Sequence, residues 1–171
     1  MRVSGLVRPN REARPIHVLQ SLRCELSSMN SPSFPLKKVI SGGQTGVDRG
    51  ALTAALCLNF DCGGWCPPGR VAEDGVIPDA YPMSEMVSGH YPERTLRNVI
   101  DSDATVIFHF GPLEGGTQKT QRLCVPHAKP HLLIDGASTD HDAATDFVRN
   151  FVMKHSDGVL NVAGPRHTPS I

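Results

Sequence analysis

The stretch KKVISGGQTGVDRGALTAAL, residues 37–56, contains the signals of a strand, a turn and a helix in direct succession. Residues 37–41 form a short run with β-branched side chains, and residues 42–46 include three glycines. Apolar residues then recur at helical spacing, at Val47, Ala51, Leu52, Ala54, Ala55 and Leu58. The stretch therefore predicts a buried strand that passes through a glycine-rich turn into an amphipathic helix.

The same alternation continues along the rest of the chain. Helical patterns cover residues 90–103 after Pro92, 115–128 and 139–155, and apolar runs typical of buried strands cover 104–110, 131–135 and 158–164. Pro126 is expected to end or kink the helix in which it falls. Strands that alternate with helices favour a parallel sheet, because each crossover helix returns the chain to the same edge. The sequence predicts one α/β domain, doubly wound, with a mainly parallel sheet flanked by helices.

Length and composition are consistent with one soluble domain. The chain has 171 residues, 39% of them hydrophobic, and no apolar run approaches the roughly 18 to 20 residues that span a bilayer. Five cysteines, an odd number in a chain of this size, favour free thiols and a cytoplasmic location over a disulfide framework. Basic and acidic residues balance at 17 each, but residues 1–36 carry a net charge of +3 and the remainder −3. A mildly acidic body disfavours a nucleic-acid partner.

Residues 1–36 have no sustained hydrophobic period and end in a patch rich in Ser, Pro and Asn. We expect a poorly ordered N-terminal extension, followed by a ligand-binding domain over residues 37–171. An Arg- and Ser-rich, acid-poor leader is also typical of an organellar transit peptide. An upstream-extended start is a further alternative, since Met29 directly precedes the compact part.

Glycine-bearing turns follow three of the predicted strands, in SGGQTG, GPLEGGT and AGPR. Ligands of open parallel sheets bind where such turns gather, outside the carboxyl ends of the strands. Glycines let successive backbone N–H groups converge, and a helix N-terminus adds partial positive charge, so the first two turns are candidate anion sites. Their candidate binding residues are Gly42, Gly43, Gln44, Thr45, Gly46, Asp48, Gly115, Gly116 and Thr117. The alternative is that Thr45 and Asp48 form a capping box and the glycines only make a tight turn.

Two further segments add candidate ligand contacts. Residues 62–82 are rich in Gly and Pro and are expected to be an irregular functional loop, in which Arg70 binds an anion and Glu73 and Asp74 accept hydrogen bonds or hold a cation. An ordinary turn with a solvated arginine explains the same residues equally well. Arg94, Arg97 and Asn98 share one face of the helix at 90–103, and Arg94 and Asn98 are expected near the border of its packing surface, within reach of the strand ends.

The sequence offers little for catalysis or for a metal site. Cys62 and Cys66 are spaced C-x-x-x-C without a second pair, which is poor zinc spacing, so we expect both to be structural. The eight histidines lack ligand spacing, and no nucleophile and base pair suggests itself. No catalytic residue and no metal ligand is therefore assigned.

Five ordered blocks, ISGGQTGVDRGAL, CGGWCPPGRVAEDGVIP, ERTLRNVIDSDATVI, GPLEGGTQKT and LNVAGPR, resemble the molybdenum carrier family, which includes molybdenum cofactor carrier proteins of algae and bacteria. The resemblance covers about residues 37–166. It implies a Rossmann-like domain, related to lysine-decarboxylase-like nucleotide phosphoribohydrolases, that forms homo-oligomers, either tetramers or dimers. It also implies a cargo, the molybdenum cofactor (molybdopterin), which such carriers protect and pass to molybdenum enzymes.

One departure bears on the activity. The phosphoribohydrolase relatives carry a catalytic glutamate after the GGT turn, whereas this chain has Gln118, Lys119, Gln121 and Arg122 in that stretch. The loss of a carboxylate removes a candidate acid or base and makes the turn more favourable for binding an anion. The leading hypothesis is a carrier of the phosphorylated pterin cofactor, with molybdate-like oxyanions as further candidate ligands. The alternative is a nucleotide-binding or nucleotide-hydrolysing protein.

Overall fold

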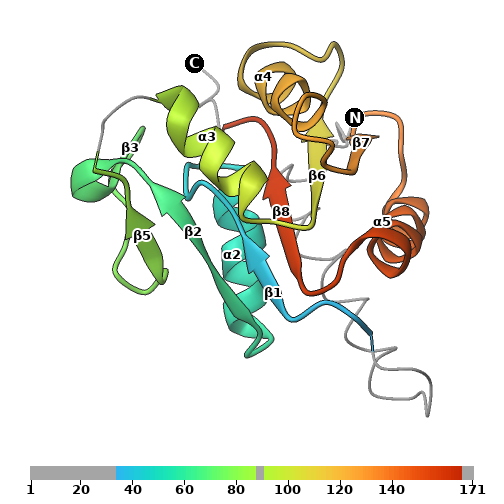
Figure 1. Cartoon of the computed structure of the whole chain (residues 1–171), viewed down its shortest axis with the longest axis horizontal. Coiled ribbons are helices and arrows are strands. Elements are labelled where there is room, and N and C mark those ends of the chain that lie inside the picture. Colours follow the sequence, from blue (N-terminus) through green and yellow to red (C-terminus); the bar gives the residue numbers. More distant parts are fainter. Residues whose placement is uncertain (1–33, 88–90, 167–171) are drawn as a thin grey trace, which may run out of the picture.

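The computed structural model describes residues 34–87 and 91–166, so the prediction for the N-terminal leader lies almost entirely outside the described residues. Figure 1 shows a central sheet with helices on both sides. In chain order the elements are β1 (Lys38–Ile40), α2 (Val47–Cys57), β2 (Asp61–Cys66), a 3-10 turn η1 (Pro68–Arg70), β3 (Val71–Ala72), β4 (Gly75–Val76), β5 (Met83–Glu85), α3 (Tyr91–Ile100), β6 (Ala104–His109), α4 (Gly115–Cys124), β7 (His131–Asp135), α5 (His141–His155) and β8 (Val159–Ala163).

The main sheet has six strands in the order β5-β2-β1-β8-β6-β7, and every neighbouring pair is parallel. The last strand of the chain, β8, lies in the middle, where Leu160 pairs with both Val39 of β1 and Ala104 of β6. In the part of the chain that the structure describes, four helices flank the sheet (Figure 1). The predicted fold class, a single Rossmann-like α/β domain with a mainly parallel sheet, is confirmed.

The helices cover the two faces of the sheet in pairs. Helix α3 contacts α4 and β2, and α4 contacts β6. On the other face, residues of α2 and α5 share one hydrophobic cluster with alternate residues of the central strands: Val47, Ala51, Leu52, Ala55, Ala144, Val148, Val152, Val39, Val106, Phe108, Leu160 and Val162. Strand side chains alternate between faces, so Ile40 and Ile107 are buried on the α3 and α4 side. Both faces are apolar, as a sheet covered on both sides requires.

Four strands were not predicted from the sequence: β2 and β5 of the main sheet, and β3 and β4, which pair with each other as an antiparallel hairpin. Residues 62–82 were expected to be irregular, yet they begin within β2, an inner strand, and β5 follows at the edge of the sheet. Strand β2 contains Gly63 and Gly64, which lower its strand propensity. A Cβ on Gly63 would lie 2.8 Å from the Pro82 carbonyl oxygen, and one on Gly64 would overlap the Ser41 carbonyl oxygen. The glycines therefore allow close backbone approach inside the sheet.

Cysteines in the described residues are free. Cys62 and Cys66 are buried in β2, and burial raises the pKa of both thiols. Their position in an inner strand fits the structural role expected for them. Within residues 34–87 and 91–166, no helix has the length and apolar character needed to cross a membrane.

Candidate functional site

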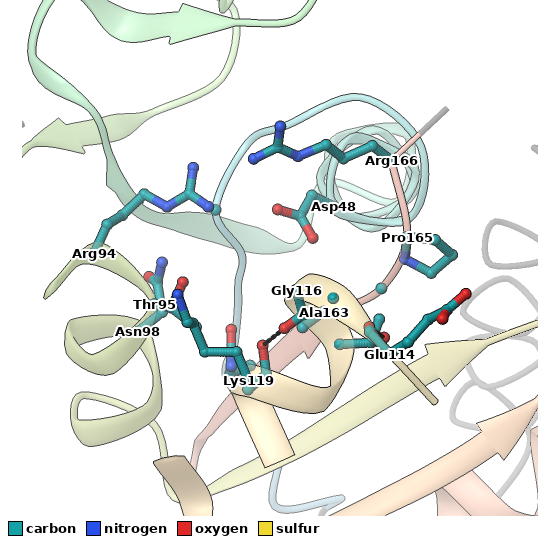
Figure 2. Close-up of a pocket in the computed structure, with 16 residues that line it drawn as sticks. Asp48, Arg94, Thr95, Asn98, Glu114, Gly116, Lys119, Ala163, Pro165 and Arg166 are labelled. Atoms are coloured by element: carbon teal, nitrogen blue, oxygen red, sulfur yellow. Dashed lines mark hydrogen bonds between the residues drawn. The ribbon is translucent and has the colours of Figure 1, made fainter. Parts of the chain in front are cut away.

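A pocket of about 370 Å³ opens at the carboxyl ends of β1, β6 and β8, where the turns into α2 and α4 meet the segment after β8. It is lined by seven residues that the sequence nominated: Gly42, Asp48, Arg94, Asn98, Gly115, Gly116 and Thr117. Residues from both predicted turns thus share one cavity. The volume falls within the range of small-molecule sites. Figure 2 shows Arg94 and Arg166 extending toward the Asp48 carboxylate above Gly116.

The α4 side of the pocket is open and rich in donors. Helix α4 begins after Glu114, whose side chain does not cap it, and the first-turn N–H groups of a helix have no acceptor within the helix. Gly115 has a φ of 56°, and a Cβ there would meet nothing within 4 Å. Lys119, one turn further along α4, also lines the pocket. This edge combines backbone donors, the positive end of a helix and a lysine, which together favour an anion.

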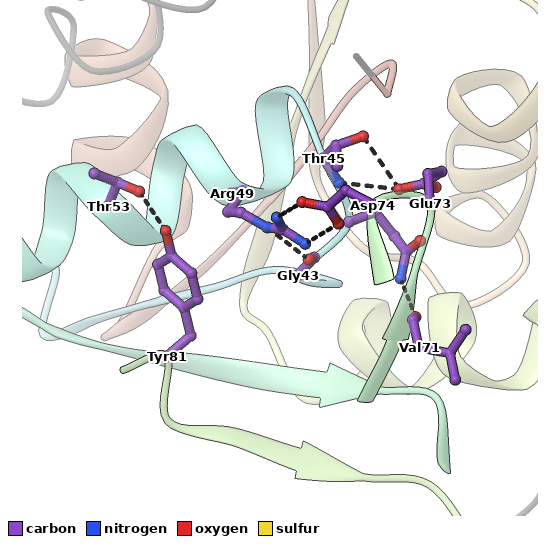
Figure 3. A network of polar contacts seen from close by, with 9 residues as sticks. Gly43, Thr45, Arg49, Thr53, Val71, Glu73, Asp74 and Tyr81 are labelled. Carbon is purple, nitrogen blue, oxygen red and sulfur yellow. Dashed lines mark hydrogen bonds and ion pairs between the residues drawn. The ribbon is translucent and has the colours of Figure 1, made fainter. Parts of the chain in front are cut away.

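The α2 side is different, because the turn of residues 42–46 already satisfies carboxylates of the protein itself. The Gln44 N–H donates to the Asp48 side chain, and the Thr45 N–H and hydroxyl donate to Glu73 Oε2 at 3.2 and 3.1 Å. The Val47 N–H donates to the Pro165 carbonyl at 3.3 Å. Figure 3 shows the Thr45 and Glu73 contacts. These donors of the turn therefore face internal carboxylates, whereas the sequence led us to expect a ligand anion there.

Four of the nominated residues lie outside the pocket, and the capping alternative is wrong. Gly43, Gln44, Thr45 and Gly46 do not line the pocket. The Gln44 side chain instead donates to the Val71 carbonyl at 3.1 Å. The N-cap of α2 is Gly46 and no side chain caps the helix, so the expected capping box does not form.

The hairpin β3–β4 also uses its charged residues internally. Arg70 donates to the carbonyls of Ile77, Pro78 and Tyr81 at 2.9 to 3.0 Å, which removes it from the pocket that it was expected to serve. Asp74 forms a bidentate pair with Arg49 (Figure 3). These contacts fold the hairpin over the turn of residues 42–46.

Glu73 likewise does not line the pocket but reaches its rim. Its Oε1 pairs with Arg166 Nε at 2.6 Å, and Arg166 does line the pocket. Hydrogen bonds from its own backbone and from Thr45, with the Arg166 charge, outweigh partial burial and lower the pKa of Glu73. Glu73 therefore positions Arg166 at the pocket mouth.

The deepest charged groups of the pocket are Asp48 and Arg94, which are 9% and 4% exposed. A Cβ on Gly42 would lie 2.8 Å from Asp48 Oδ2 and 3.3 Å from Arg94 Cζ, so both side chains pack against the same point of the turn. Burial raises the pKa of Asp48 from its ordinary 3.8 to about 6, although the Arg94 charge and hydrogen bonds from the turn oppose the rise. A buried carboxyl that titrates near neutrality in a pocket is a functional candidate on physical grounds.

Asn98 has a structural task as well as a pocket position. Its Oδ1 accepts from the Trp65 N–H at 2.9 Å and its Nδ2 donates to the Trp65 carbonyl at 3.1 Å, so it fastens α3 to β2. Arg94 and Asn98 are buried rather than at the border of the packing surface of α3. Arg97 is exposed and stacks over the Trp65 ring at 5.2 Å.

Nine lining residues were not nominated from the sequence: Thr95, Glu114, Lys119, Thr120, Asn161, Ala163, Gly164, Pro165 and Arg166. The third glycine turn, AGPR, was a signal for the last four. A Cβ on Gly164 would lie 2.6 Å from Val47 side-chain atoms, so glycine lets this segment pack on α2 and brings Arg166 to the pocket. Lys119 could have been nominated, because it belongs to the basic stretch that follows the GGT turn. Asn161 carried no signal, because only the tertiary structure places this mid-strand residue beside the cavity.

The fold and this pocket define a Rossmann-like α/β protein with a polar, mixed-charge pocket at the carboxyl edge of its sheet. Over residues 39–171 the chain matches the circularly permutated YpsA SLOG family, and it belongs to that family. A crystal structure of a protein from Syntrophus aciditrophicus SB, named "Putative molybdenum carrier protein", is 42% identical and superposes with a TM-score of 0.75. The similarity covers 77% of this chain and 84% of that one. No curated protein matches the chain.

Proposed function

We propose that this protein is a carrier of the molybdenum cofactor, which binds the phosphorylated pterin in the pocket between α2, α3 and α4 and passes it to molybdenum enzymes. The similarity to a protein named as a molybdenum carrier supports the carrier role. The observation that carries the choice of ligand is the mixture of charges in the pocket. Arg94, Lys119 and Arg166 line it together with the carboxyl groups of Asp48 and Glu114.

A simple oxyanion would need only the cationic part of this pocket. The carboxylates are acceptors, and they suit a ligand that has N–H or O–H donors in addition to its negative charge. A phosphorylated pterin has both, and a pocket of about 370 Å³ leaves room for a heterocycle beside its phosphate. We place the phosphate at the first turn of α4, near Lys119, because that edge offers uncapped backbone donors.

Native mass spectrometry tests the proposal on protein purified from cells that make the molybdenum cofactor. We expect a retained ligand with the mass of a phosphorylated pterin in the wild type. Lys119→Gln should weaken retention roughly ten- to a hundredfold, the usual effect of removing a charge-assisted contact of about 1.5 to 3 kcal/mol. Arg122→Gln, a matched change on an exposed position of α4 outside the pocket, should retain the ligand as the wild type does.

One observation favours a second candidate, the hydrolysis of nucleotides. Asp48 lies in the pocket with a pKa of about 6, which is suitable for a general acid or base. Turnover of nucleoside monophosphates by the wild type, lost in Asp48→Asn while nucleotide binding persists, would replace the carrier proposal by the enzyme. Retention of a pterin without any such turnover would eliminate the enzyme.

A further inference from the structure

We propose that anion binding in this pocket is coupled to a proton: the arriving anion pairs with Arg94, and Asp48 takes up a proton as it loses that arginine as its counter-charge. The inference concerns the regulation of the proposed binding site, and it rests on the proposed function only in that it places an anion there. Its basis is the shared position of the two side chains.

Asp48 and Arg94 reach the same spot from opposite walls of the pocket. Asp48 belongs to the first turn of α2 and Arg94 to α3, and both approach the Cβ position of Gly42 closely, at 2.8 Å for Asp48 Oδ2 and 3.3 Å for Arg94 Cζ. Both line the pocket while more than nine-tenths buried. An anion that enters beside Arg94 therefore also comes close to the Asp48 carboxylate.

The two other arginines near Asp48 are paired with other carboxylates. From the turn of residues 41–44, the Gln44 N–H and the Ser41 side chain face it, and from the hairpin the Glu73 charge opposes its ionisation. Arg166, after β8, pairs with Glu73, and Arg49, next to Asp48 on α2, pairs with Asp74. On α4, Lys119 and Glu114 line the same pocket with opposite charges.

These surroundings make protonation of Asp48 accessible near neutral pH. Burial already raises its pKa to about 6 with Arg94 beside it, and an added negative charge raises the pKa of a neighbouring carboxyl further. The anion and the ionised carboxylate thus compete for one buried guanidinium. Protonation removes the competitor and leaves the positive charge of Arg94 to the ligand.

Linkage fixes the direction of the effect. The complex binds more protons than the free protein between the two pKa values of Asp48, so anion affinity rises as pH falls through that window. With a free-protein pKa of about 6, affinity should increase by up to roughly tenfold per pH unit as pH falls toward about 6 and level off below. A carrier built in this way releases its cargo as the proton leaves.

Inorganic sulfate is the probe, because its charge does not change over this pH range. Calorimetry on the full chain, in two buffers with different ionisation enthalpies, should show proton uptake, up to one proton per sulfate, at a pH about one to two units above the pKa of Asp48. Asp48→Asn should bind sulfate at the alkaline end as tightly as the wild type binds it at the acidic end, with no pH slope. Asp74→Asn, a hairpin carboxylate outside the pocket, should keep the wild-type slope.

Three results would each overturn the coupling. They are equal sulfate affinity of the wild type and Asp48→Asn at alkaline pH, the absence of proton uptake, and the absence of sulfate binding at any pH. The proposed function fails separately. Proton-coupled sulfate binding in a protein that retains no pterin would leave the coupling standing and remove the carrier assignment. A retained pterin with pH-independent sulfate binding would do the reverse.

Discussion

In the turn of residues 42–46, the N–H groups of Gln44 and Thr45 donate to Asp48 and Glu73, whereas residues 115–117, which form the first turn of α4, face the pocket. Both turns combine glycines with a hydroxyl residue at the start of a helix. The first is packed under the β3–β4 hairpin. The second lies at the surface of the pocket, with no atom within 4 Å of a Cβ on Gly115.

The difference separates two uses of glycine. At Gly43, with a φ of 72°, a Cβ would lie 3.0 Å from Ile77 Cδ1 and 3.1 Å from Met83 Cε, so glycine there serves packing as well as turn geometry. Gly115 also has a positive φ, but nothing packs against its Cβ position, so the absence of a side chain leaves room for a ligand. A glycine turn before a helix therefore indicates where backbone donors converge, and the neighbouring elements decide whether those donors stay available.

The largest expected effect comes from placing the same side chain in both turns. Gly43→Ala should lower the free energy of unfolding by about 2 to 4 kcal/mol, since a strained backbone adds to overpacking against Ile77 and Met83. Gly115→Ala should cost only about 1 kcal/mol, from backbone strain alone. Urea denaturation of both variants measures the comparison. Equal losses would show that packing does not distinguish the two turns.

The second largest effect should come from Asp48, the pocket carboxylate to which the turn of residues 42–46 donates a hydrogen bond. The folded protein keeps a proton on Asp48 up to about pH 6, while the unfolded chain releases it near its ordinary pKa of 3.8. The stability that this proton contributes is present below pH 3.8 and is lost as pH rises through about 6. Above that range, the buried charge costs up to about 3 kcal/mol.

Asp48→Asn should therefore be more stable than the wild type by up to about 3 kcal/mol at about pH 8. Below the ordinary pKa of the carboxyl the two proteins should converge, because both then carry a neutral side chain at this position. Thermal unfolding over a pH series measures the difference. A wild type that is the more stable protein at alkaline pH would mean that Arg94 and the turn stabilise the ionised carboxylate more than burial opposes it.

The smallest effect should come from the hairpin that covers the first turn. Asp74 is about half exposed, and Asp74→Asn removes its pair with Arg49 at a cost below about 1 kcal/mol, as is usual for surface ion pairs. The pair lowers the pKa of Asp74, so its contribution is present above pH 3.8 and is lost as pH falls through the lowered value. Urea denaturation at low and high salt checks this. A loss as large as that of Gly43→Ala would make the ion pair, and not the packing, the main clamp on the turn.

Periodicity predicted those elements whose residues favour the structure that they adopt. Strand β6 is an almost continuous apolar run, β7 and β8 are mainly apolar, and α4 ends at Cys124, two residues before Pro126, as proline geometry requires. Strand β2 escaped prediction because Gly63 and Gly64 are selected by contacts with Pro82 and Ser41, which lie elsewhere in the chain. Local propensity cannot report a constraint that a distant backbone imposes.

The sequence by itself determined the α/β alternation, the parallel sheet and the edge of that sheet where a site would form. These features follow from the hydrophobic period of each segment and from the order of strands and helices along the chain. It also marked Asp48, Arg94 and the GGT turn as site residues. Only the tertiary structure decided which donors remain available. Glu73 and Asp48 occupy the first turn, Arg70 is taken by backbone carbonyls, and Arg166 arrives from the end of the last strand. The reason is that a hydrogen-bond donor binds whichever acceptor the folded chain places beside it, and here that acceptor comes from residues far away in the sequence.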